Sequence, residues 1–301
     1  MSPAPEREAA EDGLTVHLAL LGAQAGFAVF PVFGKLALTS LSPLVLAALR
    51  VAAASVLLEA YRRARGDPAP TRGDRRILFL LALLGVSFNQ MLFILGLALT
   101  TAVNTAVLTA TIPVFTLAVA VLLGREQLTP RALAGMVLAF AGALVLLDIG
   151  HFDWSSQFVR GDVMLLANCL SYSFYLVLGR PVMARIPAST AVASVFVYGA
   201  PVILLCAAPA LSRFSPRSVT PRAWASLAAI VLLCSVIPYL LNSWALARTH
   251  ASRVALYVFL QPLIGAGASV AVLAEPLTPR TLAAAGLIFA GLGVTLWPGR
   301  W

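Results

Sequence analysis

The segment AEPLTPRTLAAAGLIFAG at residues 274–291 repeats the segment REQLTPRALAGMVLAFAG at residues 125–142. When one copy is displaced by 149 residues, eleven of the eighteen positions are identical, and Glu126 and Pro130 fall on Glu275 and Pro279. Such a match, half a chain apart, predicts two copies of one structural unit. A fold for this chain must therefore accommodate two equivalent halves.

The composition assigns both halves to a membrane. Of the 301 residues, 60% are hydrophobic and 11% are charged, whereas a soluble domain has about 45–50% apolar and about 25% charged residues. The net charge of +9 could indicate nucleic-acid binding, but the arginines lie between apolar runs and are better explained as topology signals. We therefore predict an all-α polytopic membrane protein whose surroundings are the lipid bilayer and which binds no nucleic acid.

The chain contains ten apolar runs of the required length, because a helix needs about 20 apolar residues to cross a hydrocarbon core about 30 Å thick. They lie at roughly 14–37, 43–61, 77–98, 102–123, 130–148, 161–180, 188–210, 222–245, 251–274 and 280–298. The expected organisation is a cytoplasmic tail (1–13), a five-helix unit (14–148), an external linker (149–160), a second five-helix unit (161–298) and a cytoplasmic C-terminus (299–301).

The arginines predict the orientation. With the N-terminus inside, fourteen arginines lie on the cytoplasmic side and five on the other, three of which are Arg213, Arg217 and Arg222 in one loop. The positive-inside rule then places both termini in the cytoplasm, and we expect a bacterial inner membrane. Because five is an odd number, the second unit enters the membrane inverted. Inverted units can open a central cavity to either side, which favours a transporter that works by alternating access.

Two segments resemble a known family. They are YLLNSWALARTHASRVALYVFLQPLIGAGASVAVLAEPLTP in the second half and LGLALTTAVNTAVLTATIPVFTLAVAVLLGREQLTP in the first. Together with Lys35-Leu36-Ala37, Pro43 and Leu49-Arg50, they are similar to the EamA-type branch of the drug/metabolite transporter superfamily. The resemblance implies ten helices around a central cavity and export of metabolites or amino acids, with YddG-type exporters of aromatic amino acids as the nearest in kind.

Polar and aromatic side chains recur on single faces of several predicted helices. Unpaired polar groups are costly in hydrocarbon, so these faces should point to the interior. The alternative for each residue is an interhelical hydrogen bond, which contributes about 0.6 kcal/mol. The predicted substrate-binding residues are Gln24, Phe27, Arg50, Asn89, Gln90, Phe93, Asn104, Thr109, Asn168, Tyr172, Tyr175, Tyr239, Asn242, Tyr257 and Gln261.

Four residues carry alternatives that the pattern leaves open. Arg50 either binds a substrate carboxylate or holds helices together through backbone carbonyls or a partner such as Asp148. Lys35 either binds substrate or reaches the membrane interface. Pro113 and Pro262 lie 149 residues apart; each lacks a backbone donor and is expected to act as a hinge or to form a static kink.

No carboxylate is expected near the membrane midplane, which favours facilitative or weakly coupled transport. Motifs of an intramembrane enzyme are missing: there is no HExxH helix, no Gly-x-Ser-Gly turn and no paired intramembrane aspartates. We therefore expect a small-molecule substrate, an amino acid above all, and no enzymatic activity, cofactor or metal. The alternatives are transport of phosphorylated sugars or other anionic metabolites, which would need several cationic residues, and a channel. No oligomeric state is predicted.

The orientation can be tested by labelling introduced cysteines in intact cells. A membrane-impermeant thiol reagent should label Phe152→Cys in the 149–160 linker and should leave Gly66→Cys, in the loop after the second span, unlabelled. The opposite pattern would reverse the predicted orientation.

Overall fold

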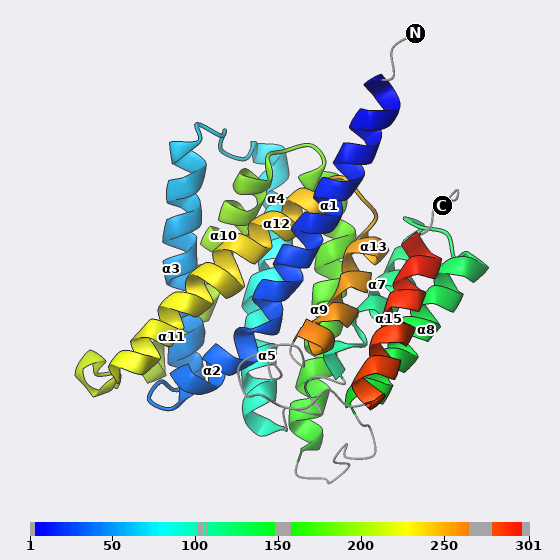
Figure 1. The fold of residues 1–301 in the computed structure, drawn as a ribbon. Helices are drawn as coiled ribbons and strands as arrows, with labels where there is room; N and C mark the ends of the chain where they lie inside the picture. The colour runs from blue at the N-terminus through cyan, green and yellow to red at the C-terminus, as the bar shows by residue number, and fades with distance from the viewer. Residues whose placement is uncertain (1–3, 101–104, 106–107, 148–157, 265–278, 297–301) are drawn as a thin grey trace.

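The computed structural model describes residues 4–100, 105, 108–147, 158–264 and 279–296, the side chains of 4–12, 31, 35, 146, 147, 280, 281 and 296 excepted. Within these ranges the regular elements are all helical (Figure 1). They are α1 (Ala4–Ala28), α2 (Phe30–Leu38), α3 (Pro43–Ala64), α4 (Arg72–Ala82), η1 (Leu83–Ser87), α5 (Phe88–Leu99), α7 (Ile112–Leu122), α8 (Pro130–Leu147), α9 (Val159–Met183), α10 (Ala188–Leu211), η3 (Pro216–Ser218), α11 (Pro221–Val231), η4 (Leu232–Val236), α12 (Ile237–Leu246), α13 (Ala251–Leu256), η5 (Tyr257–Phe259) and α15 (Pro279–Leu296).

The prediction of an all-α polytopic membrane protein is confirmed. Six helical stretches are long and apolar enough to cross a membrane, and four shorter apolar helices, 112–122, 130–145, 251–264 and 282–295, fall on the remaining predicted spans. The count of ten spans stays a prediction, as do the unit boundaries, because the 149–160 linker and residues 299–301 lie mostly or wholly outside the described residues.

The first predicted span differs in two respects. Helix α1 begins at Ala4, inside the expected tail, where Glu, Arg and Ala residues favour helix formation. The span is also broken at Val29, and α2 then begins with a proline in its first turn. A proline there has no backbone N–H to donate to the preceding helix, so the helix is interrupted at this point.

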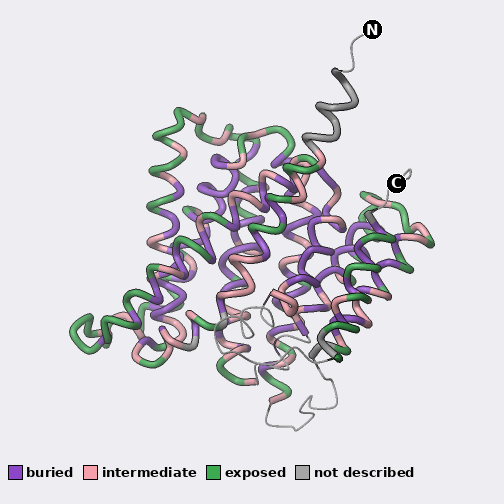
Figure 2. The backbone as a smooth tube through the Cα atoms, in the orientation of Figure 1, coloured by how far each residue is buried: buried purple, intermediate pink, exposed green. Residues whose placement is uncertain are grey.

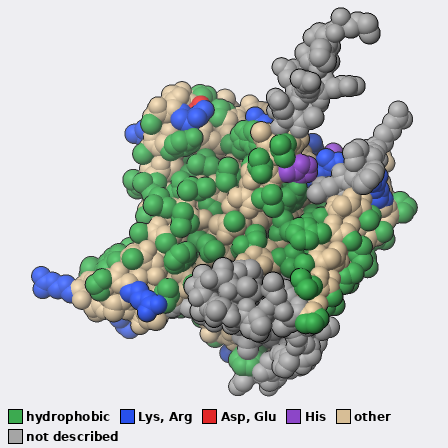
Figure 3. Space-filling view, viewed as in Figure 1, with side chains coloured by type: hydrophobic (Ala, Val, Ile, Leu, Met, Phe, Trp, Pro, Cys, Tyr) green, Lys and Arg blue, Asp and Glu red, His purple; other side chains and the backbone are tan. Residues whose placement is uncertain are grey.

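The outer flank of the molecule is apolar, as a lipid-facing surface must be (Figure 3). Val56, Leu122 and Leu205 are among the large aliphatic side chains that are exposed. Lys and Arg side chains gather toward the ends of the visible face. The buried residues lie where helices face one another (Figure 2), and they include polar side chains on several helices.

The closest helix pairs are α8 with α15, α3 with α10, α5 with α9, and α1 with α12. A displacement of 149 residues carries α8 onto α15, α3 onto α10, α1 onto α9 and α5 onto α12. The first two pairs therefore map onto themselves, and the last two map onto each other. Each of these four helix–helix contacts therefore has an equivalent contact after a displacement of 149 residues, which is either the same contact or another of the four.

Two π-helical turns share this relation. The turn η1 joins α4 to α5, and η4 joins α11 to α12. Their bounds differ by 149 residues at both ends. Single π-turns inside α-helices are rare and are frequently found at functional sites.

Helices α8 and α15 cross in close backbone contact. A Cβ atom added at Gly135 would lie 1.9 Å from Thr295 Oγ1, and one at Gly291 would lie 2.5 Å from the Gly135 carbonyl oxygen. A Cβ added at Gly142 would lie 2.9 Å from the Ala284 carbonyl oxygen. Residues with higher numbers in α8 contact residues with lower numbers in α15, so the two helices are antiparallel. Small residues permit this approach, which is a common way to associate helices in membranes.

Substitution at this crossing should destabilise the protein. Gly291→Ala places a methyl group against the α8 backbone, and we expect a cost of about 1–3 kcal/mol from overpacking. Gly293→Ala in the same helix is the matched control, because nothing lies within 4 Å of its added Cβ; there the higher helix propensity of alanine should leave stability equal or raise it. The measurement is the midpoint of thermal unfolding in detergent. Equal midpoints for the two variants would contradict this account of the crossing.

Candidate functional site

A cavity of about 100 Å³ lies between the helices. It is contributed by both halves of the chain, and its walls combine aromatic rings, side-chain amides and one guanidinium. Its described lining residues are Gln24, Phe27, Phe30, Arg50, Asn89, Gln90, Phe93, Thr109, Ile112, Asn168, Tyr172, Tyr239, Val258 and Gln261.

Most of the predicted binding positions line this cavity. Eleven of the fifteen do so, and Phe30, Ile112 and Val258 complete the lining without having been predicted. Tyr175, Asn242 and Tyr257 are absent from the described lining, and Asn104 lies outside the described residues. The polar faces of separate helices thus meet in one place, although their role in binding is not tested by this placement.

Arg50 is the only charged side chain among the described lining residues, and it is 4% exposed. Its Nε donates to Ser235 Oγ at 2.8 Å, Nη1 donates to Gln90 Oε1 at 2.5 Å, and Nη2 donates to the Cys234 carbonyl oxygen at 3.2 Å. The guanidinium carbon lies 4.5 Å from the centre of the Phe30 ring, in a cation–π contact. The cation is therefore held by neutral groups, and each terminal nitrogen keeps a second N–H beyond these bonds.

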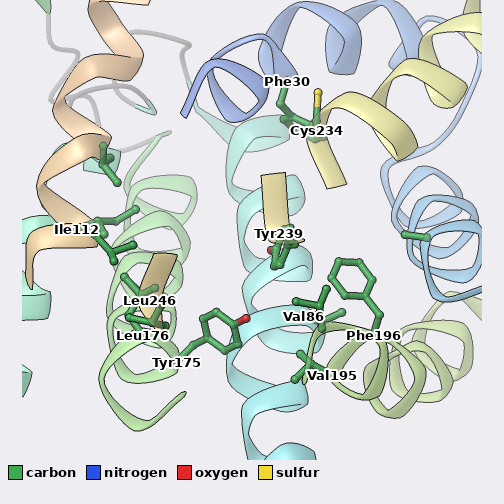
Figure 4. Close-up of a cluster of buried hydrophobic side chains, with 14 of the residues drawn as sticks. Phe30, Val86, Ile112, Tyr175, Leu176, Val195, Phe196, Cys234, Tyr239 and Leu246 are labelled. Atoms are coloured by element: carbon green, nitrogen blue, oxygen red, sulfur yellow. The ribbon is translucent and has the colours of Figure 1, made fainter. Parts of the chain in front are cut away.

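The two π-turns supply backbone acceptors to the cavity wall. Cys234 in η4 accepts from Arg50, and Gly85 in η1 accepts from the Tyr239 hydroxyl at 3.2 Å. Gly85 and Cys234 are 149 residues apart. In η4 the cause is visible in the sequence, because Pro238 has no N–H to offer the carbonyl four residues earlier. Arg50 contacts both Cys234 and Phe30, whose side chains are labelled in Figure 4.

Gln90 and Tyr239 connect the halves directly. They are also 149 residues apart, and Gln90 Nε2 donates to the Tyr239 hydroxyl at 2.7 Å. The Tyr239 ring packs edge-on against Phe196, with ring centres 4.9 Å apart (Figure 4). It also packs edge-on against Phe27, with ring centres 5.5 Å apart. Arg50, Gln90 and Tyr239 thus form one hydrogen-bonded chain that ends on the Gly85 carbonyl.

The amide side chains hold neighbouring helices and leave oxygen acceptors at the cavity. Asn168 Nδ2 donates to the Asn89 carbonyl oxygen at 2.7 Å, and Asn89 Nδ2 donates to the Asn168 carbonyl oxygen at 3.4 Å. Gln261 Nε2 donates to Gln24 Oε1 at 2.7 Å. Within the described part of the chain, Asn89 Oδ1, Asn168 Oδ1 and Gln261 Oε1 accept no hydrogen bond, so interhelical bonding and ligand recognition are compatible for these residues.

Three predicted positions lie behind or beside the cavity wall. The Tyr175 ring packs on Gly85, where an added Cβ would meet its Cδ2 at 2.3 Å, and it stacks on Tyr172 with ring centres 5.7 Å apart. Asn242 Nδ2 donates to the Tyr172 hydroxyl at 3.3 Å. Tyr257 bonds through its hydroxyl to His17 Nδ1, and the two rings stack. Helical spacing predicted the face of each residue, but not its depth behind the wall.

The chain is irregular just before each of the two predicted hinge prolines. A turn at 110–111 precedes α7 and Pro113, and the 3-10 turn η5 at Tyr257–Phe259 precedes Pro262. This agrees with the expected loss of a backbone donor; whether the helices move there stays a prediction. Lys35 lies in α2, and its side chain falls outside the description.

The five carboxylates described by the structure lie near helix ends or in loops, and each has a partner there. Glu59 pairs with Arg62 and Arg63, Asp67 with Arg65, Asp74 with Arg185, Glu126 binds Ser252, and Asp162 accepts from Thr100. None of these five contacts Arg50, and Asp148, which the sequence suggested as a partner of Arg50, lies outside the described residues. The described residues also contain no group of three His, Cys, Asp or Glu side chains that could hold a metal ion.

Comparison with known proteins identifies the family. The sequence model of the EamA-like transporter family matches the chain twice, over residues 14–148 and 159–297. The chain therefore belongs to the EamA-like transporter family, and it is a multi-pass membrane transporter.

The relatives come from several kingdoms. An uncharacterized transporter of Archaeoglobus fulgidus is 33% identical over 78% of this chain and 81% of its own length. Protein WALLS ARE THIN 1 of Arabidopsis thaliana is 26% identical over 94% of this chain and 83% of its own, and the uncharacterized transporter YetK of Bacillus subtilis is 24% identical over 94% and 87%. A solved crystal structure, 18% identical, has a TM-score of 0.78 and covers 94% of this chain and 98% of its own, which shows a shared fold.

The link between Gln90 and Tyr239 can be tested through stability. Tyr239→Phe removes the hydroxyl and leaves the Gln90 amide and the Gly85 carbonyl without this buried partner, so we expect a loss of about 1–3 kcal/mol. Tyr198→Phe is the control, since the Tyr198 hydroxyl makes no hydrogen bond within the described residues. Thermal unfolding midpoints in detergent should fall for Tyr239→Phe alone; an unchanged midpoint would show that this hydrogen bond contributes little.

Proposed function

We propose that this transporter exports a small metabolite that combines one carboxylate with an apolar or aromatic body, a class that includes the aromatic and neutral amino acids expected from the sequence. The observation that carries the proposal is Arg50, a buried cation at the cavity wall without a carboxylate partner among the described residues. Burying an unpaired charge is costly, so a binding anion gains from neutralising it.

The free N–H groups of Arg50 suit a carboxylate. A guanidinium presents donors in a planar fork, and two parallel N–H···O bonds to a carboxylate are strong and specific. The rest of the lining matches the other end of such a molecule, because Phe27, Phe30 and Phe93 offer apolar surface and the amides offer a few orienting contacts. Ligand sites commonly combine mostly apolar walls with a few polar groups.

The alternative substrates fit this cavity less well. A phosphorylated sugar is a dianion and would be expected to meet several cations, whereas the described lining contains Arg50 alone. A channel can be distinguished from a carrier by measuring flux, because the flux through a channel would not saturate at the substrate concentrations that saturate a carrier.

The proposed mechanism is alternating access between two inverted halves, with both termini in the cytoplasm of a bacterium. The reciprocal helix contacts support it, since halves with exchangeable packing can exchange conformations. The irregular turns before Pro113 and Pro262 are the proposed hinges. The position of the described carboxylates away from the cavity supports facilitative or weakly coupled transport.

The test is uptake into proteoliposomes, with radiolabelled amino acids and their des-amino carboxylic acids supplied with and without a proton gradient. We expect saturable uptake of at least one carboxylate. Arg50→Gln should lower its apparent affinity by at least about thirtyfold, because it removes a desolvated charge partner. Arg50→Lys should retain part of the affinity, since it keeps the charge and loses the fork.

Arg222→Gln at the exposed start of α11 is the matched control and should transport normally. Gel filtration must show all variants to be folded. Unaltered uptake by folded Arg50→Gln would remove the arginine from the substrate site, and flux without saturation would indicate a pore.

A further inference from the structure

The cavity has an unbalanced charge. Its described lining contains one guanidinium and otherwise only neutral side chains. Each of the five described carboxylates is bonded elsewhere, as set out above. The guanidinium itself is bonded to a hydroxyl, an amide oxygen and a backbone carbonyl, none of which carries a formal charge. The described site therefore has a net charge of +1 before a ligand enters.

The position in the second half that corresponds to Arg50 carries no cation. The position 149 residues after Arg50 is Gly199 on α10. A Cβ added there would lie 3.0 Å from Val86 Cγ1 and 3.1 Å from Ser87 Oγ, and the Gly199 carbonyl accepts from Ser87 Oγ at 3.1 Å. A long cationic side chain has no room at this point. Among the described lining residues, the positive charge of Arg50 therefore has no counterpart at the equivalent position.

We infer, building on the proposed function, that the preferred substrate is a monoanion: an apolar or aromatic carboxylic acid without an ammonium group. A monoanion on the Arg50 fork makes the site neutral. A zwitterionic amino acid leaves the site at +1 and places its ammonium, which adjoins the carboxylate, near the guanidinium. Like charges repel strongly where water is excluded.

The available acceptors do not reverse this preference. Asn89 Oδ1, Asn168 Oδ1 and Gln261 Oε1 can accept from an ammonium, but a neutral dipole offsets only part of the cost of removing a full charge from water. The carboxylate class and the site are those already proposed. The new element is that the site selects substrates by their net charge. An experiment can contradict this selection and still support the transport of carboxylates.

Binding to purified protein in nanodiscs tests the inference with three matched pairs of ligands. Each pair consists of an amino acid and its des-amino acid: phenylalanine with 3-phenylpropanoate, tryptophan with 3-indolepropanoate, and leucine with 4-methylpentanoate. Phenylalaninamide serves as the cationic probe. Isothermal titration should show at least tenfold tighter binding of the des-amino acid in the best-bound pair, and no binding of the amide.

The second part of the experiment uses a variant that is expected to gain a preference for amino acids. Gln261→Glu adds a carboxylate to the cavity wall with little change in shape, and it should move the preference toward the amino acid by at least tenfold. Asn168→Asp makes the same change from another helix if the first variant does not fold. Gln127→Glu is the matched control, because Gln127 is exposed in the loop before α8 and should leave the preference unchanged.

The outcomes separate the two proposals. Equal or tighter binding of the amino acids by the wild type overturns selection by net charge and leaves carboxylate transport intact. Binding of neither member of any pair overturns the carboxylate site and this inference with it. A shift by Gln127→Glu as large as that by Gln261→Glu would show that the effect comes from overall charge and would also overturn the inference.

Discussion

The arrangement of the cavity depends on how one buried guanidinium is satisfied. Arg50 reaches from α3 to Gln90 on α5 and to two residues of the π-turn η4, and its face rests on Phe30 of α2. These contacts fix four elements around one buried cation. Because all the partners are neutral, the charge is held in position without being cancelled, so the structural contacts of Arg50 are compatible with the binding role proposed for it.

The internal relation by 149 residues extends from the sequence to individual contacts. Gln90 bonds to Tyr239, its own counterpart, and the glycine crossing of α8 and α15 maps onto itself. The relation does not extend to the identity of the side chains at the cavity, where Arg50 corresponds to Gly199 and Gln90 to Tyr239. The shared framework can support similar packing in both halves, while different side chains at equivalent positions make the cavity lining asymmetric. This explains how a nearly symmetric fold can still bind an asymmetric molecule.

The sequence predicted the helices and most of the cavity lining because apolar length and polar periodicity are local properties that burial enforces directly. It predicted the faces of Tyr175, Asn242 and Tyr257 but not their depth, which depends on how far neighbouring helices approach. Phe30 was missed since an aromatic residue near a helix break has no periodic signal. The two π-turns were also missed. Pro238 is a visible cause for η4, whereas η1 has no proline and is shaped by Tyr175 packing on Gly85 and by the donor from Tyr239.

The crossing of α8 and α15 has a mechanical consequence. Side chains that interdigitate can change rotamer and let helices slide, but Gly135, Gly142 and Gly291 have no side chain to adjust, and the backbones themselves are in contact. Axial displacement of either helix would bring Ala139 or Thr295 against main-chain atoms, so the pair resists shear. These two helices can then move as one rigid unit. A rearrangement around the cavity would therefore involve rotation of the other helices relative to this pair.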